Sequence, residues 1–134
     1  MFYIGFVHKD LDSDYGISFP DFPGCISAGK TFEDAMRMGK EALGFHAEMM
    51  IEMGQDLPKA RSLEDIKSDD SGFWDAQDIE SAEIVRVPLI MNLERSKRVN
   101  ISINPSLLTA IDQAAKEQGM TRSAFIASAA FQHL

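Results

Sequence analysis

The chain is poor in the residues that build cross-linked, metal-binding or membrane-embedded proteins. Its 134 residues include one cysteine, Cys25, which excludes an internal disulfide and a zinc site built from cysteines. The three histidines, His8, His46 and His133, lie far apart in the sequence and lack the close pairing typical of a metal site. No apolar run approaches the roughly 20 residues that a membrane-spanning helix needs. We therefore expect no cofactor, no bound metal and no membrane contact.

The composition is that of a globular protein, with 45% hydrophobic and 25% charged residues. Residues 2–7 alternate like a strand and have neither the basic start nor the small-residue cleavage site of a signal peptide. These features predict a cytoplasmic protein. The length leaves room for one ordinary domain or two small ones.

Charge is divided unevenly along the chain. Residues 1–84 contain 7 Lys and Arg against 18 Asp and Glu, a balance of −11, whereas residues 85–134 contain 6 against 3, a balance of +3. The acidic part would repel nucleic acid and attract a basic protein, while the basic part could approach phosphates. The two parts are therefore expected to meet partners of opposite charge.

The first 30 residues predict a small antiparallel sheet. The Asp-rich segment 10–14 is typical of a turn, and strands are expected around 17–19 and 25–28. Residues 20–24, Pro-Asp-Phe-Pro-Gly, predict a rigid turn, because proline fixes φ and Gly24 can adopt a positive φ. One face of the first strand is expected to carry Phe2, Ile4 and Phe6.

A long amphipathic helix should follow, extending over about 23 residues. Thr31 and Asp34 resemble a capping box at its start, and Gly54 stands where a glycine commonly ends a helix. The helix is long enough to cover a three-stranded sheet, which predicts an α+β fold with a three- to four-stranded antiparallel or mixed sheet. Its apolar positions are Phe32, Ala35, Met36, Gly39, Ala42, Leu43, His46, Met49, Met50 and Met53.

The segment from 55 to 81 is polar and acidic. It predicts one short helix around 62–68 and contains one large aromatic pair, Phe73 and Trp74. Strand character returns at 84–89, where Pro88 favours the edge of the sheet or the end of the strand. This strand would be the fourth of the sheet.

The tail predicts a strand followed by two helices. Residues 98–103 alternate strictly, with Val99, Ile101 and Ile103 on one face and Arg98, Asn100 and Ser102 on the other. Asn104 and Pro105 are a typical helix start, Gly119 ends that helix, and Thr121 begins another. About 37 residues are too few for an adequate core, so a partner is required.

The economical partner is a second copy, which would pair with the exposed edge of the lone strand. Two strands would form an antiparallel ribbon, whose outer face fits the DNA major groove. We expect base contacts from Arg98, Asn100 and Ser102. The start of the second helix suits a phosphate, with contacts expected from Thr121, Arg122 and Ser123.

Residues 98–134 resemble a ribbon-helix-helix DNA-binding domain. The resemblance rests on the segment RVNISINPSLLTAIDQAAKEQGMTRSAFIASAA. The alternating strand, first cap, turn and second cap occur in the order of that family. The alternative is a tail that dimerises without touching DNA.

Residues 1–90 resemble the HicB antitoxin domain. The resemblance rests on a P-D-x-P-G-C turn, a G-x-T-x-E/D-A helix start and a G-x-x-x-P exit at 54–58. It implies a reduced RNase H-like fold that binds and blocks HicA, a small basic mRNA-cleaving toxin with a double-stranded-RNA-binding-like fold. It also implies that the tail binds the operator of its own operon and represses it. Residues 91–97 are expected to be a connector. The fold of the tail requires a homodimer, and a tetramer through the N-terminal domains stays open. Which residues contact the toxin is left unknown.

Two rival functions stay open. One is a stand-alone ribbon-helix-helix regulator whose N-terminal domain senses a ligand or oligomerises. The other is a divalent-metal nuclease that uses the turn carboxylates with Glu41 or Glu48. We expect no catalysis, because those carboxylates lie on one turn or along one helix. The spacing of Asp10, Asp12, Asp14 and Asp21 also imitates a calcium loop, but Tyr15 replaces its required glycine, which favours a solvated turn.

The isolated histidine, cysteine and methionine side chains of this part of the chain are expected to be structural. His46 is expected to be buried and hydrogen-bonded. Cys25 is expected to be a small buried hydrophobe rather than a nucleophile. The methionines between Met36 and Met53 are expected to fill the core.

Overall fold

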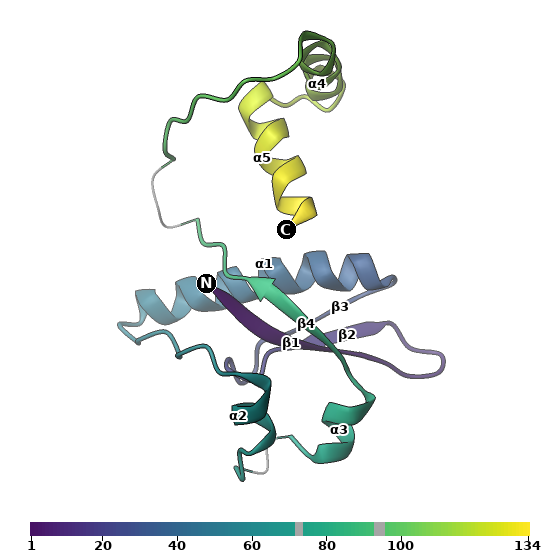
Figure 1. The fold of residues 1–134 in the computed structure, drawn as a ribbon, viewed down its shortest axis with the longest axis vertical. Helices are drawn as coiled ribbons and strands as arrows, with labels where there is room; N and C mark the ends of the chain where they lie inside the picture. The colour runs from purple at the N-terminus through teal and green to yellow at the C-terminus, as the bar shows by residue number, and fades with distance from the viewer. Residues whose placement is uncertain (72–73, 93–95) are drawn as a thin grey trace. The chain divides into compact units, whose positions relative to one another are not determined.

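The computed structural model describes residues 1–71, 74–92 and 96–134, in two compact units, Met1–Glu94 and Arg95–Leu134. Phe73 and part of the expected connector at 91–97 lie outside the described residues. The N-terminal unit contains β1 (Phe2–Lys9), β2 (Tyr15–Ser18), β3 (Ile26–Gly29), α1 (Phe32–Glu52), α2 (Leu63–Lys67), α3 (Ala76–Ser81) and β4 (Glu83–Pro88) (Figure 1). The C-terminal unit contains α4 (Pro105–Glu117) and α5 (Arg122–His133).

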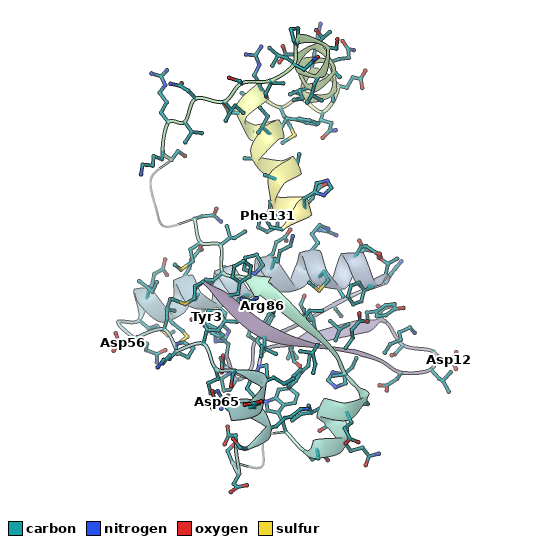
Figure 2. The ribbon with its side chains drawn as sticks, in the orientation of Figure 1. Tyr3, Asp12, Asp56, Asp65, Arg86 and Phe131 are labelled. Carbon is teal, nitrogen blue, oxygen red and sulfur yellow. The ribbon has the colours of Figure 1, made fainter. Side chains whose placement is uncertain are left out.

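The N-terminal unit has a four-stranded sheet in the order β3-β2-β1-β4, with every neighbouring pair antiparallel. Phe6 lies opposite Ser18 on one side and Ile84 on the other. The turn between β1 and β2 has Asp12 at its tip with φ of 65° (Figure 2). This confirms the predicted α+β fold, the strands predicted within residues 1–90 and the predicted turn at 10–14.

One face of the sheet packs against α1 (Figure 1). The rings of Tyr3 and Phe22 meet edge to face, with their centroids 4.7 Å apart. The rigid turn at 20–24 forms as predicted, with Gly24 at φ of 86°. The buried residues of this core are Tyr3, Val7, Ile17, Phe19, Phe22, Cys25, Leu43, Ala47 and Val87.

The other face of the sheet is covered by α2 and α3 (Figure 1). Phe6, Ile66 and Ile79 form a second buried cluster, and the Trp74 ring packs edge-on against Phe6 with centroids 5.3 Å apart. The face shared by Ile4 and Phe6 therefore points away from α1. The sequence predicted only one covering helix and the short α2, so this second core and α3 are findings of the structure.

Capping defines both ends of α1. The Thr31 Oγ accepts a hydrogen bond from the Asp34 backbone N–H at 3.1 Å, and Gly54 follows the helix with φ of 74°. The helix has 21 residues rather than about 23. Among the described residues, no helix combines the length and the apolarity required to cross a membrane.

The predicted apolar face of α1 is wrong at its C-terminal end. Met49 is 41% exposed and Met53 is 68% exposed, so neither fills the core. The buried stripe instead includes Leu43 and Ala47. Since successive helical residues are rotated by about 100°, Met49 points roughly 200° away from Ala47 and faces solvent.

The chain that leaves β4 passes very close to α1 at Gly44. A Cβ built on Gly44 would lie 2.2 Å from the Ile90 carbonyl oxygen, a distance that real Cβ atoms do not adopt. The Glu48 carboxylate accepts a hydrogen bond from the Asn92 backbone N–H nearby. A glycine at position 44 is therefore needed for this backbone to reach the helix.

Candidate functional site

The two helices of the C-terminal unit begin as the sequence predicts. The Asn104 Oδ1 accepts from the Ser106 N–H at 2.9 Å, and Pro105 is the first residue of α4. The Thr121 Oγ accepts from the Ala124 N–H at 3.1 Å to start α5. Gly119, with φ of 66°, lies in the turn between them.

The C-terminal unit leaves its apolar side chains uncovered. Of its described residues, Ala115 alone is buried. Val99 is 71% exposed, Ile101 61% and Leu107 55%, although large aliphatic side chains are normally inside. In a single copy of residues 96–134, α4 and α5 therefore contact each other without enclosing a buried hydrophobic core.

Residues 98–103 adopt no strand in the single chain. A strand requires a hydrogen-bonded neighbour, and the neighbour expected from the sequence is another copy, so the ribbon stays a prediction. The polar residues of its predicted outer face, Arg98, Asn100 and Ser102, are all exposed.

Most of the predicted DNA-contacting residues surround one groove of about 850 Å³ within the C-terminal unit. Its lining combines the segment 96–101, which includes Arg98 and Asn100, with one side of α5 between Arg122 and Ala130, which includes Arg122 and Ser123. Ser102 and Thr121 do not belong to the lining. The groove thus places both kinds of predicted contact, to bases and to phosphates, around the same opening.

Arg122 is engaged by an acidic residue of α4. Its Nε and Nη2 donate to the two carboxylate oxygens of Asp112, each at 2.8 Å. These bonds lower the pKa of Asp112 below its ordinary value and raise that of Arg122. A phosphate that binds Arg122 would have to compete with this carboxylate. The Thr121 hydroxyl is likewise in use, as the cap of α5.

In the N-terminal unit, an ion pair that was not predicted from the sequence joins the turn at 20–24 to Arg61. The Asp21 side chain is 1% exposed and receives the Arg61 Nε at 2.6 Å and its backbone N–H at 3.1 Å. Arg61 also donates to the Pro20 carbonyl and to the Asp69 carboxylate. Asp21 is therefore committed to a structural contact; the available signal was its place inside a turn fixed by two prolines.

The remaining candidates have ordinary surroundings. Cys25 is buried, as predicted, and burial raises the pKa of its thiol to about 11, which leaves it protonated at neutral pH. His46 is half-buried rather than buried, and its ring packs edge-on against Phe22 with centroids 5.9 Å apart. Its place beside the P-D-x-P-G turn, at the border of the buried stripe, explains the partial exposure.

The turn carboxylates do not converge on a common point. Asp10, Asp12 and Asp14 are exposed, and the Asp10 carbonyl accepts from the Ser13 N–H within the turn. Over the described residues, no group of three or more His, Cys, Asp or Glu side chains is arranged to hold a metal ion.

Known proteins resemble this chain over most of its length. A 14.9 kDa protein from the rep-hol intergenic region of Haemophilus phage HP1 is 33% identical over 128 residues, which cover 94% of this chain and 92% of the phage protein. The crystal structure of the Burkholderia pseudomallei antitoxin HicB is 32% identical, with a TM-score of 0.53 and coverage of 100% of this chain and 98% of that one.

A further similar structure is a chain of the HicA3 and HicB3 toxin-antitoxin complex. It is 26% identical with a TM-score of 0.52, and the match covers 67% of this chain and 99% of that chain. The family model for the HicB-like antitoxin of bacterial toxin-antitoxin systems matches residues 3–130. The chain therefore belongs to the HicB-like antitoxin family.

Proposed function

We propose that this antitoxin binds and inhibits a HicA-type mRNA-cleaving toxin through residues 1–90, and represses its own operon through residues 98–134. In this proposal residues 91–97 connect the two parts. The chain catalyses no reaction and acts in the cytoplasm, where the toxin meets mRNA. A tetramer assembled through the N-terminal units is compatible with the same scheme.

The observation that carries the proposal is the uncovered apolar surface of the C-terminal unit. Val99, Ile101 and Leu107 are each more than half exposed. Burying such a side chain fully contributes about 1.5–3 kcal/mol, so two copies have a large gain from covering each other. Pairing residues 98–103 of two chains would also satisfy the strand edges. We expect a homodimer with an antiparallel ribbon over four helices.

The same pairing would turn polar residues outward. Arg98, Asn100 and Ser102 from each chain would lie along the ribbon, where arginine can donate to guanine and asparagine can pair with adenine. Thr121, Arg122 and Ser123 at the start of α5 are proposed to contact phosphates. The balance of +3 over residues 85–134 favours approach to DNA.

The N-terminal part suits a basic protein rather than nucleic acid. Its balance of −11 over residues 1–84 repels phosphates and attracts positive charge. The HicA-type toxin that the family resemblance implies is small and basic. The acidic charge therefore supports toxin capture by this unit.

Replacing Asn100 with Ala tests the DNA-binding part. Because Asn100 is exposed and belongs to the polar face, the variant should remain dimeric. Its affinity for the operator should approach its affinity for random DNA, since one good bidentate base contact contributes about 1–3 kcal/mol of discrimination. Gel-shift titrations with both DNAs and sedimentation measure the two properties. A variant that discriminates as the parent does would contradict the assignment.

Co-expression with the neighbouring gene tests the toxin-binding part. The expected result is that a small basic toxin is captured in a pull-down and that growth is rescued. An operon without such a gene would instead favour a stand-alone regulator.

A further inference from the structure

Helix α1 carries an exposed apolar stripe on the side turned away from the sheet. Phe45 is 64% exposed, Met49 41% and Met53, at the C-cap, 68%. Met38 and Ala42 are half-buried and extend the same line. The five residues are spaced by three or four positions, which places them on one side of a helix. We refer to Met38, Ala42, Phe45, Met49 and Met53 as the α1 stripe.

Acidic residues border the α1 stripe. Glu41, Glu48 and Glu52 are spaced by seven and four positions, and at about 100° per residue they form a ridge next to Phe45. The helix also begins with Glu33 and Asp34.

The two basic residues of α1 offset only part of the charge of its five acidic residues, which leaves the helix with a balance of −3. Arg37 contacts Asp34 at 3.5 Å and Glu41 at 3.6 Å, while Lys40 is buried. The surface around the stripe is therefore negative.

This combination has the anatomy of a protein interface. Aromatic and methionine side chains are enriched in the cores of interfaces, and a polar rim surrounds them. An exposed phenylalanine ring supplies the kind of large anchor that dominates binding energy once it is desolvated. Within the α1 stripe, Ala42 packs at the border of the buried core. Phe45, Met49 and Met53 are exposed, so packing in the core does not explain their apolar character.

The acidic ridge decides which occupant fits. A second copy related by a two-fold axis would bring the same carboxylates toward one another, and like charges at an interface are costly. Nucleic acid would be repelled for the same reason. A basic protein would gain both the burial of Phe45 and Met49 and the attraction of the ridge.

We propose that the α1 stripe is the docking surface for the basic toxin. This inference rests on the proposed function and assigns the toxin contact to particular residues. Phe45 and Met49 are the desolvated anchors, and Glu41 and Glu52 form a rim that speeds association with a positively charged partner.

The test uses the full-length antitoxin and the purified toxin from the neighbouring gene, with binding measured by calorimetry or surface plasmon resonance. Phe45→Ser and Met49→Ser should each raise the Kd at least about 30-fold, the effect of an interface hot spot. The matched control is Ile26→Ser, because Ile26 is 72% exposed and is in register with Ser18 and Phe6, on the sheet face opposite α1. This control should bind as the parent does.

Charge reversal gives an independent readout. Glu52→Lys should slow toxin association and weaken its dependence on salt, without a change in the thermal midpoint. The operator affinity and sedimentation of Phe45→Ser should match the parent.

Each contrary outcome has a definite meaning. If the parent binds the toxin and both anchor variants bind equally well, the docking surface is wrong while the proposed function stands. If Phe45→Ser dissociates the antitoxin, the stripe joins two copies and the toxin assignment is overturned. If the parent binds no toxin, the proposed function itself fails.

Discussion

Asp21 and Arg61, 40 residues apart in the sequence, form an ion pair in which the aspartate is buried and the arginine is partly exposed. The Arg61 Nε lies 2.6 Å from the Asp21 Oδ1, and its guanidinium also reaches the Pro20 carbonyl at 3.1 Å. The hydrogen bond to Asp21 is the largest cause that raises the pKa of Arg61, followed by the hydrogen bond to Asp69. The pair fastens the turn at 20–24 to the segment that leads into α2.

Replacing Asp21 with Ala should destabilise the N-terminal unit by about 2–3 kcal/mol. The substitution leaves the arginine without its main acceptor, although Arg61 keeps part of its contact with water. Urea unfolding of the full chain measures the loss. Asp69→Ala is the comparison, because it removes the more exposed acceptor of Arg61, together with an exposed hydrogen bond from the Ser71 N–H, and should cost less. Equal losses from the two variants would contradict the central place of Asp21.

Gly44→Ala should destabilise the same unit by about 1–3 kcal/mol, the usual cost of overpacking. The new Cβ would meet the Ile90 carbonyl, which belongs to the backbone and cannot rotate away. Gly16→Ala serves as the comparison, since a Cβ there meets nothing within 4 Å. Thermal midpoints of the two variants should separate clearly. A Gly44 variant as stable as the Gly16 variant would show that the chain after β4 can move from the helix.

Acid should weaken the cap of α2. The Asp65 pKa lies below its ordinary 3.8, mainly because the Ser62 side chain donates to its carboxylate. A carboxyl group with a lowered folded-state pKa stabilises the fold above its unfolded value, and this contribution is lost as the pH falls through the folded value. The urea concentration at the unfolding midpoint should therefore decrease as the pH is lowered below about 4. Ser62→Ala should reduce that drop; an unchanged pH profile would speak against the cap.

Asp112→Asn should tighten binding to DNA of any sequence. The substitution removes the carboxylate charge that holds Arg122, so a phosphate no longer competes with it. Arg122→Ala should do the opposite and reduce the slope of log affinity against log salt by about 0.9 for each lost phosphate contact. Titrations at several salt concentrations measure both effects. If Asp112→Asn leaves the affinity unchanged, Arg122 does not contact phosphate.

Local signals in the sequence located the elements well. The cap at Thr31 and the glycine at Gly54 marked the ends of α1, and Asn104 and Thr121 marked the starts of α4 and α5. Capping is readable because it involves only neighbouring residues. The α+β class followed from the alternation of the strands around one long helical pattern.

Contacts between distant segments were harder to predict. The second core depends on Ile66 and Ile79, isolated apolar residues in an acidic stretch, and nothing local shows that both reach Phe6. Arg61 was missed for the same reason, since its partner lies 40 residues away. Met49 was wrongly predicted to be buried, because many apolar residues in succession do not show which of them belong to the buried face of the helix.

The exposed aliphatic side chains of Val99, Ile101 and Leu107 have a consequence for how repression depends on the antitoxin concentration. Under the proposed pairing, the amount of assembled repressor rises with the square of the antitoxin level while copies are scarce, because two must meet for each to hide these side chains. Transcription would then shut off more sharply than the antitoxin accumulates. Under the same pairing, loss of part of the antitoxin would lower the amount of assembled repressor by more than the fraction lost.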